Sequence, residues 1–273
     1  MENNNIGSVL GEMGCKFRSN IETQIEKRKQ HKGDDAEWLL DPLDELSHPV
    51  DYVLDAYLVS SRWDSHYKLY FHLRNAKDIY IPYDETLSWL DEQENTKTDG
   101  YTAHMLGLEQ FFYDDLKPKP FDKSMMIKGA LDYRAAHMIP EIWDELVVPF
   151  TTFGIWQAVL LHQTITLFPK GWHAAYMDNI YVYSLEDMEE IIKHHKRGSY
   201  DFDHEKLATY LNRDDIMPAV EIDGDKAIAS YFYWNDWSGF CRMIIPIEKH
   251  GHSIKFGEFE SETHVKYDCR IRY

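Results

Sequence analysis

The sequence predicts an α+β protein with a helical middle section, a small N-terminal β-meander and a C-terminal antiparallel sheet of about four to five strands. Period-two alternation of apolar and polar residues marks strands at residues 66–74 and again after residue 217. Apolar residues at helical spacing, ended by prolines, occupy the region between these strands. No internal repeat is present, which sets repeat architectures aside.

The N-terminal part is expected to begin with a flexible polar lead over residues 1–15. Residues 16–31 follow as a helix, because they contain good helix formers and neither Gly nor Pro. Residues 16–273 are expected to form one α+β domain. A sub-division near residues 214–217, between a helical part and a C-terminal β-meander, stays open.

The N-terminal meander is predicted from three short segments at residues 53–59, 66–74 and 79–81. The second is the clearest of the three, since every other residue from Tyr67 to Leu73 is apolar.

Helices are expected to make up most of the middle of the chain, at residues 84–94, 101–116, 123–137, 151–168, 184–197 and 203–212. The helix over residues 151–168 is apolar around most of its circumference, which is typical of a central helix covered on several sides. Ser184 is the expected N-cap of the next helix, with Asp187 three residues later.

The C-terminal sheet is expected to begin with a hairpin that joins residues 219–222 to residues 226–234 around an Asp-Gly turn. Strands at residues 240–248 and 253–259 follow, and the alternation slips near Gly257 as at a β-bulge. Alternation is strictest over residues 265–273, which predict the last strand.

Composition limits the function classes. The chain of 273 residues is 44% hydrophobic and carries a formal net charge of −18. Nucleic acid and anionic membranes are therefore excluded as expected partners, since both attract clustered Lys and Arg. Three cysteines without a CxxC pair and a polar N-terminus predict a cytoplasmic protein.

Catalytic chemistry is not indicated by any standard motif, and the sequence predicts no cofactor and no metal site. His250 and His252 flank a glycine and are interpreted as exposed turn residues rather than metal ligands. The only candidate catalytic residues are His162 and His173, which would perform acid–base chemistry if they met beside a carboxylate. Since active sites are assembled from distant residues, an enzyme is not excluded.

Binding chemistry is concentrated in two places. The first is an acidic run that follows the expected helix over residues 16–31, and its carboxylates are Asp34, Asp35, Glu37, Asp41, Asp44 and Glu45. The second is the turn that contains Trp234, Asp236 and Trp237. Two indoles around a carboxylate either close the hydrophobic end of the sheet or form an aromatic wall suited to a cation or a protein partner.

These observations favour a non-enzymatic, cytoplasmic, acidic binding protein that neutralises a basic protein partner, of the toxin-immunity type. A negative field speeds the encounter with such a partner, although the charge also serves solubility alone. Two alternatives stay open. One is a hydrolase or metal-dependent enzyme that uses His162, His173 and nearby carboxylates, and the other is a subunit of a larger assembly. The oligomeric state is not predicted.

Overall fold

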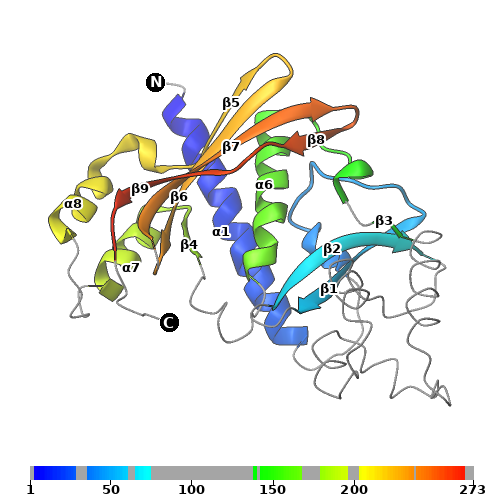
Figure 1. Ribbon diagram of the computed structural model, residues 1–273, viewed down its shortest axis with the longest axis horizontal. Coiled ribbons are helices and arrows are strands. Elements are labelled where there is room, and N and C mark those ends of the chain that lie inside the picture. Colours follow the sequence, from blue (N-terminus) through cyan, green and yellow to red (C-terminus); the bar gives the residue numbers. More distant parts are fainter. Residues whose placement is uncertain are drawn as a thin grey trace, which may run out of the picture.

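The computed structural model describes residues 3–28, 36–60, 65–74, 138–139, 142–167, 179–195, 203–236 and 238–267 (Figure 1). These residues contain four α-helices, four short 3-10 helices and two antiparallel sheets. In chain order the elements are α1 (Asn3–Arg28), η1 (Glu37–Leu39), β1 (Tyr52–Ser60), β2 (Ser65–Leu73), β3 (Met138–Ile139), η2 (Ile142–Asp144), α6 (Thr152–Leu167), β4 (Asn179–Val182), α7 (Leu185–His195), α8 (His204–Thr209), η4 (Tyr210–Asn212), η5 (Asp214–Ile216), β5 (Ala219–Asp223), β6 (Lys226–Asn235), β7 (Gly239–His250), β8 (Ser253–Phe256) and β9 (Glu260–Val265).

The larger sheet has six strands and is built around the long antiparallel pair of β6 and β7. On the edge of β6 that does not pair with β7, β5 pairs with the first half of the strand and β4 with the second half. β8 and β9 share the free side of β7 in the same way. The α+β class and the C-terminal antiparallel sheet are thus confirmed, with β4 as an additional strand contributed from the middle of the chain.

The two faces of this sheet are covered by different helices. Ala229 and Tyr231 of β6 belong to a core shared with α1 and α6. Phe232 and Trp234 of the same strand belong to a second core shared with α7 and α8. Successive side chains of a strand point to opposite faces, so nearly every residue of β6 is buried against one layer or the other.

Helix α6 lies between α1 and the smaller sheet (Figure 1), and its buried residues belong to the first core. Every residue of the helix from Ile155 to Leu161 is buried. The same core contains Leu54 and Phe71 of the smaller sheet, which has the strand order β1-β2-β3. A central helix at this position was predicted and is confirmed.

Helix α1 begins at residue 3, so the predicted flexible lead over residues 1–15 is wrong for residues 3–15. Leu10 is completely buried, and its carbonyl accepts a hydrogen bond of 2.8 Å from the indole N–H of Trp156. Gly11 allows the close approach of α1, because a Cβ there would lie only 2.1 Å from the carbonyl oxygen of Tyr183. The polar composition of these residues did not indicate a helix, and the contacts of its glycines with Met217 and Tyr183 depend on distant parts of the chain.

Other predicted elements differ in detail. The hairpin of β5 and β6 and the helices α6, α7 and α8 lie where they were expected. The predicted bulge near Gly257 is a complete break between β8 and β9, and β9 ends at Val265, where the last strand was expected to begin. The helices predicted at residues 84–94, 101–116 and 123–137 and the strand at residues 79–81 lie outside the described residues.

Candidate functional site

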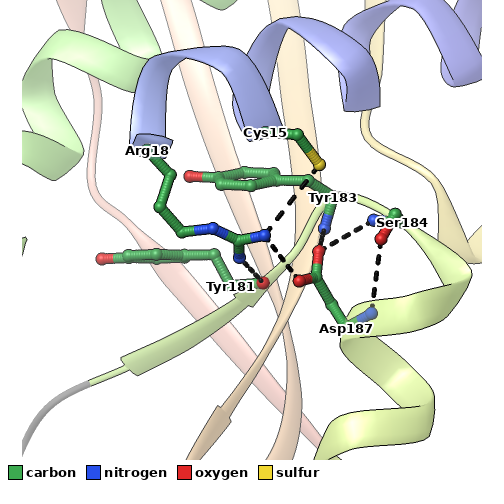
Figure 2. Close-up of polar contacts among 6 residues, drawn as sticks. All are labelled: Cys15, Arg18, Tyr181, Tyr183, Ser184 and Asp187. Atoms are coloured by element: carbon green, nitrogen blue, oxygen red, sulfur yellow. Dashed lines mark hydrogen bonds and ion pairs between the residues drawn. The ribbon is translucent and has the colours of Figure 1, made fainter. Parts of the chain in front are cut away.

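A cluster of polar contacts joins α1 to the start of α7, and Figure 2 shows its six residues. The guanidinium of Arg18 forms an ion pair with Asp187 at 2.6 Å. It also donates to the carbonyl of Tyr181 at 3.3 Å and lies over the ring of Tyr183. The other carboxylate oxygen of Asp187 accepts the backbone N–H groups of Tyr183 and Ser184, at 2.9 and 3.0 Å. Asp187 therefore binds Arg18 of α1 and also caps the N-terminus of α7.

The predicted N-cap of this helix is present, since the backbone N–H of Asp187 donates to the hydroxyl of Ser184 at 3.3 Å. Together with the contact from Asp187 back to the Ser184 N–H, this forms a reciprocal capping arrangement. The positive end of the helix dipole is occupied by the chain's own carboxylate, so the N-terminus of α7 is not available to an external anion.

The contacts of this cluster hold α1 against the start of α7. Burial and the negative charge of Asp187 raise the pKa of the Cys15 thiol, so this thiol is protonated and a poor nucleophile at neutral pH. Burial lowers the pKa of Arg18, but the hydrogen bond and charge of Asp187 outweigh it and leave that pKa raised. A permanently charged guanidinium beside the Asp187 carboxylate forms the ion pair that joins α1 to α7.

His162, the first catalytic candidate, lies on α6 among aromatic rings. Its ring centroid is 4.8 Å from that of Phe259, 5.1 Å from that of Phe256 and 6.3 Å from that of Trp143. Burial lowers the pKa of His162 from 6.5 to about 4. The imidazole is thus neutral at physiological pH. His173, its expected partner, lies outside the described residues.

Burial of this histidine makes stability depend on pH. Between pH 6.5 and about pH 4 the unfolded chain binds a proton at His162 that the folded chain does not bind, so stability falls as the pH is lowered through this window. We expect the wild type to lose about 3 kcal/mol more than His162→Leu between pH 7 and pH 4, an order-of-magnitude figure from the linkage relation. Urea unfolding of both proteins at several pH values measures the difference. Parallel pH profiles would contradict it.

The acidic run is held against α6 by one glutamine. The side-chain amide of Gln157 donates to Asp44 at 2.7 Å, and its oxygen accepts the backbone N–H of Glu45 at 2.8 Å. Two residues further on, Ser47 pairs with Val147 in an isolated antiparallel bridge. The two chain segments on either side of this bridge, residues 36–51 and 142–150, are called the acidic segments below.

The acidic segments contain seven carboxylates and no Lys or Arg. Asp41, Asp44 and Glu45 are exposed, whereas Glu37 forms an ion pair with Arg74 at 3.0 Å. Asp34 and Asp35, the first two members of the predicted run, lie outside the described residues. The acidic residues of α7 belong to the opposite face of the sheet, because α7 packs on the second core and α6 on the first. These two acidic regions are therefore separate.

Of the two interpretations of the turn after β6, the burial of Trp234 favours the one in which the indole closes the hydrophobic end of the sheet. This side chain is 1% exposed and packs against the ring of Tyr267 at 5.1 Å. Its indole N–H donates to Asp236 at 2.8 Å. Trp234 therefore belongs to the second core, and its indole is buried rather than part of an exposed aromatic wall. Trp237 lies outside the described residues.

A second histidine, His264, has polar neighbours. Its Nδ1 lies 2.8 Å from the hydroxyl of Tyr210, and its Nε2 lies 3.7 Å from a carboxylate oxygen of Glu262. Burial lowers the pKa of His264, and the charges of Arg213 and Arg242 add to the effect against the opposing charge of Glu262. These contacts tie β9 to η4 on the face of the sheet that carries the second core.

Within the described residues, no group of three or more His, Cys, Asp and Glu side chains is arranged to hold a metal ion. The helices among these residues also lack the length and apolar character that a membrane span requires. Comparisons with protein families, with curated proteins and with solved structures found no match to this chain. The site is therefore interpreted from its own geometry.

Two groups of residues in this site were not singled out from the sequence. Arg18 and Asp187 are 169 positions apart, and only a capping role for Asp187 was recognisable locally. The rings of Trp143, Phe256 and Phe259 come from separate short segments around His162. These rings share one signal in the sequence, which is a bulky ring next to carboxylates in a stretch without Lys or Arg. It is present in Trp143-Asp144-Glu145 and in residues 256–260.

Proposed function

We propose that this chain is a non-enzymatic binding protein for a basic protein partner and that the acidic segments supply its contact surface. The main observation behind this proposal is the pair of hydrogen bonds that Gln157 of the central helix makes with Asp44 and Glu45, called the clamp below. The clamp fixes an exposed acidic stretch against α6. Neutralisation of a basic effector in the cytoplasm, as immunity proteins do, is the activity that such a surface serves.

The charge pattern supports this proposal in two ways. The acidic segments carry seven carboxylates and no Lys or Arg of their own, and one of the seven, Glu37, is paired with Arg74. The exposed carboxylates Asp41, Asp44 and Glu45 give this surface a negative field, which steers a cationic protein toward it. The clamp and the Ser47–Val147 bridge hold the backbone of this surface before the partner arrives. Such preorganisation lowers the entropic cost of forming a complex.

The first experiment identifies the partner. Tagged protein purified from its native cell is expected to bring down a basic protein in a stable ratio, and the association rate of the purified pair is expected to fall steeply with salt. An association rate that is indifferent to salt would contradict an electrostatic mode of recognition.

The second experiment locates the surface on the chain. Neutralising Asp41, Asp44 and Glu45 in the variant D41N/D44N/E45Q is expected to slow association with the basic partner about tenfold at low salt. The amide that replaces the Asp44 carboxylate still offers an oxygen to Gln157, so the fold is retained. The matched control is E189Q/E190Q/E205Q, which removes three exposed charges from α7 and α8. Equal slowing in both variants would show that net charge alone, and not the acidic segments, directs binding.

The enzyme alternative has a direct test as well. Substituting His162 and His173 without loss of any detected activity would remove it. The neutral imidazole of His162 among aromatic rings gives it no support, since a general base needs a pKa near the working pH. The alternative of an assembly subunit would be marked by a continuous exposed apolar face. The large exposed apolar side chains of the described residues lie on several different elements.

A further inference from the structure

Four rings from different parts of the chain gather beside the acidic segments. Trp143 of η2 contacts the ring of Phe256 of β8 edge-on, with centroids 4.9 Å apart. His162 of α6 lies against Phe256 and against Phe259, which follows β8. All four residues are only partly buried. Trp143, His162, Phe256 and Phe259 are called the aromatic cluster below.

The chain segments that carry the aromatic cluster are acidic. Residues 142–167 and 256–265, which carry all four rings, contain five carboxylates and no Lys or Arg. The carboxylates are Asp144, Glu145, Glu258, Glu260 and Glu262. The nearest lysine in sequence, Lys255, is directly opposite Glu248 in the β7–β8 ladder, and strand alternation places it on the other face from Phe256.

Aromatic faces beside carboxylates attract cations. The π face of an aromatic ring carries a negative quadrupole, which is most effective with Trp and which binds guanidinium groups in particular. His162 does not oppose such a ligand, since its burial keeps the imidazole uncharged at neutral pH. The charged groups that flank the cluster, Asp144 and Glu145 beside Trp143 and Glu258 beside Phe259, add attraction of the same sign.

We propose that the aromatic cluster binds an arginine side chain of the basic partner, whose guanidinium stacks on these partly exposed rings. The inference rests on the proposed function and names the anchor of the same surface, since Trp143 lies within the second acidic segment. A second copy of this chain is a poor occupant, because two molecules with a net charge of −18 each repel one another. Buried aromatic and arginine contacts surrounded by polar groups are the usual composition of binding hot spots.

The test uses a dye-labelled peptide in which three arginines are separated by Gly-Ser, and a matched peptide with citrulline in place of arginine. Citrulline keeps the shape of the side chain and removes its charge. Fluorescence anisotropy is expected to show at least fivefold tighter binding of the arginine peptide to the wild-type chain. The variants Trp143→Leu and Phe259→Leu, which remove a π face and keep an apolar side chain, are each expected to weaken this binding about threefold to tenfold.

The matched control is Phe153→Leu, which replaces a 40% exposed ring on α6 outside the aromatic cluster and is expected to leave peptide binding unchanged. Circular dichroism and thermal unfolding check that each variant is folded. Equal binding of the two peptides, no binding of either, or the same affinity in all three ring variants would overturn the inference. The proposed function fails separately, if D41N/D44N/E45Q and its α7–α8 control bind the basic partner protein at the same rate.

Discussion

Replacing Asp187 with alanine is expected to lower the free energy of unfolding by about 3 kcal/mol. The substitution removes the ion pair with Arg18, whose side chain is 27% exposed, and leaves the guanidinium without its carboxylate. It also deprives the backbone N–H groups of Tyr183 and Ser184 of their acceptor at the start of α7. Chemical denaturation monitored by circular dichroism measures the loss.

Asp187→Asn provides the matched control for this prediction. The asparagine oxygen still accepts backbone N–H groups, so only the charge is lost, and an intermediate cost of about 1–2 kcal/mol is expected. If the alanine variant were within about 1 kcal/mol of the wild type, the contacts of Figure 2 would not be what holds α1 to α7.

Replacing Gly11 with alanine is expected to destabilise the chain by about 3 kcal/mol, because the new methyl group has no room. A Cβ at this position would lie 2.1 Å from the backbone oxygen of Tyr183, so either the helix or the strand end must move. Gly7→Ala is the control on the same helix, since its nearest atom is the side-chain Cβ of Met217 at 3.1 Å.

Alanine has a helix propensity about 1 kcal/mol better than glycine, so Gly7→Ala is expected to lie within about 1 kcal/mol of the wild type. Thermal unfolding of both variants makes the comparison. Similar melting temperatures for Gly11→Ala and Gly7→Ala would show that α1 does not pack closely on Tyr183.

Local patterns predicted the elements whose determinants lie close together in sequence. Ser184 and Asp187 are three residues apart, so their capping role was recognisable before the structure was known. The β5–β6 hairpin is encoded by the turn at Gly224, which has a φ of 59°, and by alternation on either side of it. The burial of α6 followed from its apolar circumference.

Contacts between distant segments were not predictable in the same way. The polar residues and glycines of residues 3–15 do not resemble a core helix, and their burial depends on Trp156 and Tyr183, far along the chain. Trp234 was ambiguous because its exposure depends on Tyr267. The acidic run was recognised from charge alone, but its attachment to α6 depends on Gln157, 112 positions from Glu45.

The docking of α1 has a consequence for how the chain folds. Its contacts reach residue 156 from Leu10, residue 183 from Gly11 and residue 187 from Arg18. A helix with three glycines has little stability on its own, so α1 depends on contacts with segments that are synthesised much later. Contacts of such long sequence separation slow folding. During synthesis, we therefore expect the apolar side chains of Leu10, Phe17 and Ile21 to stay uncovered until α6 and the start of α7 are made. In this interval the nascent chain is expected to aggregate most readily and to bind chaperones.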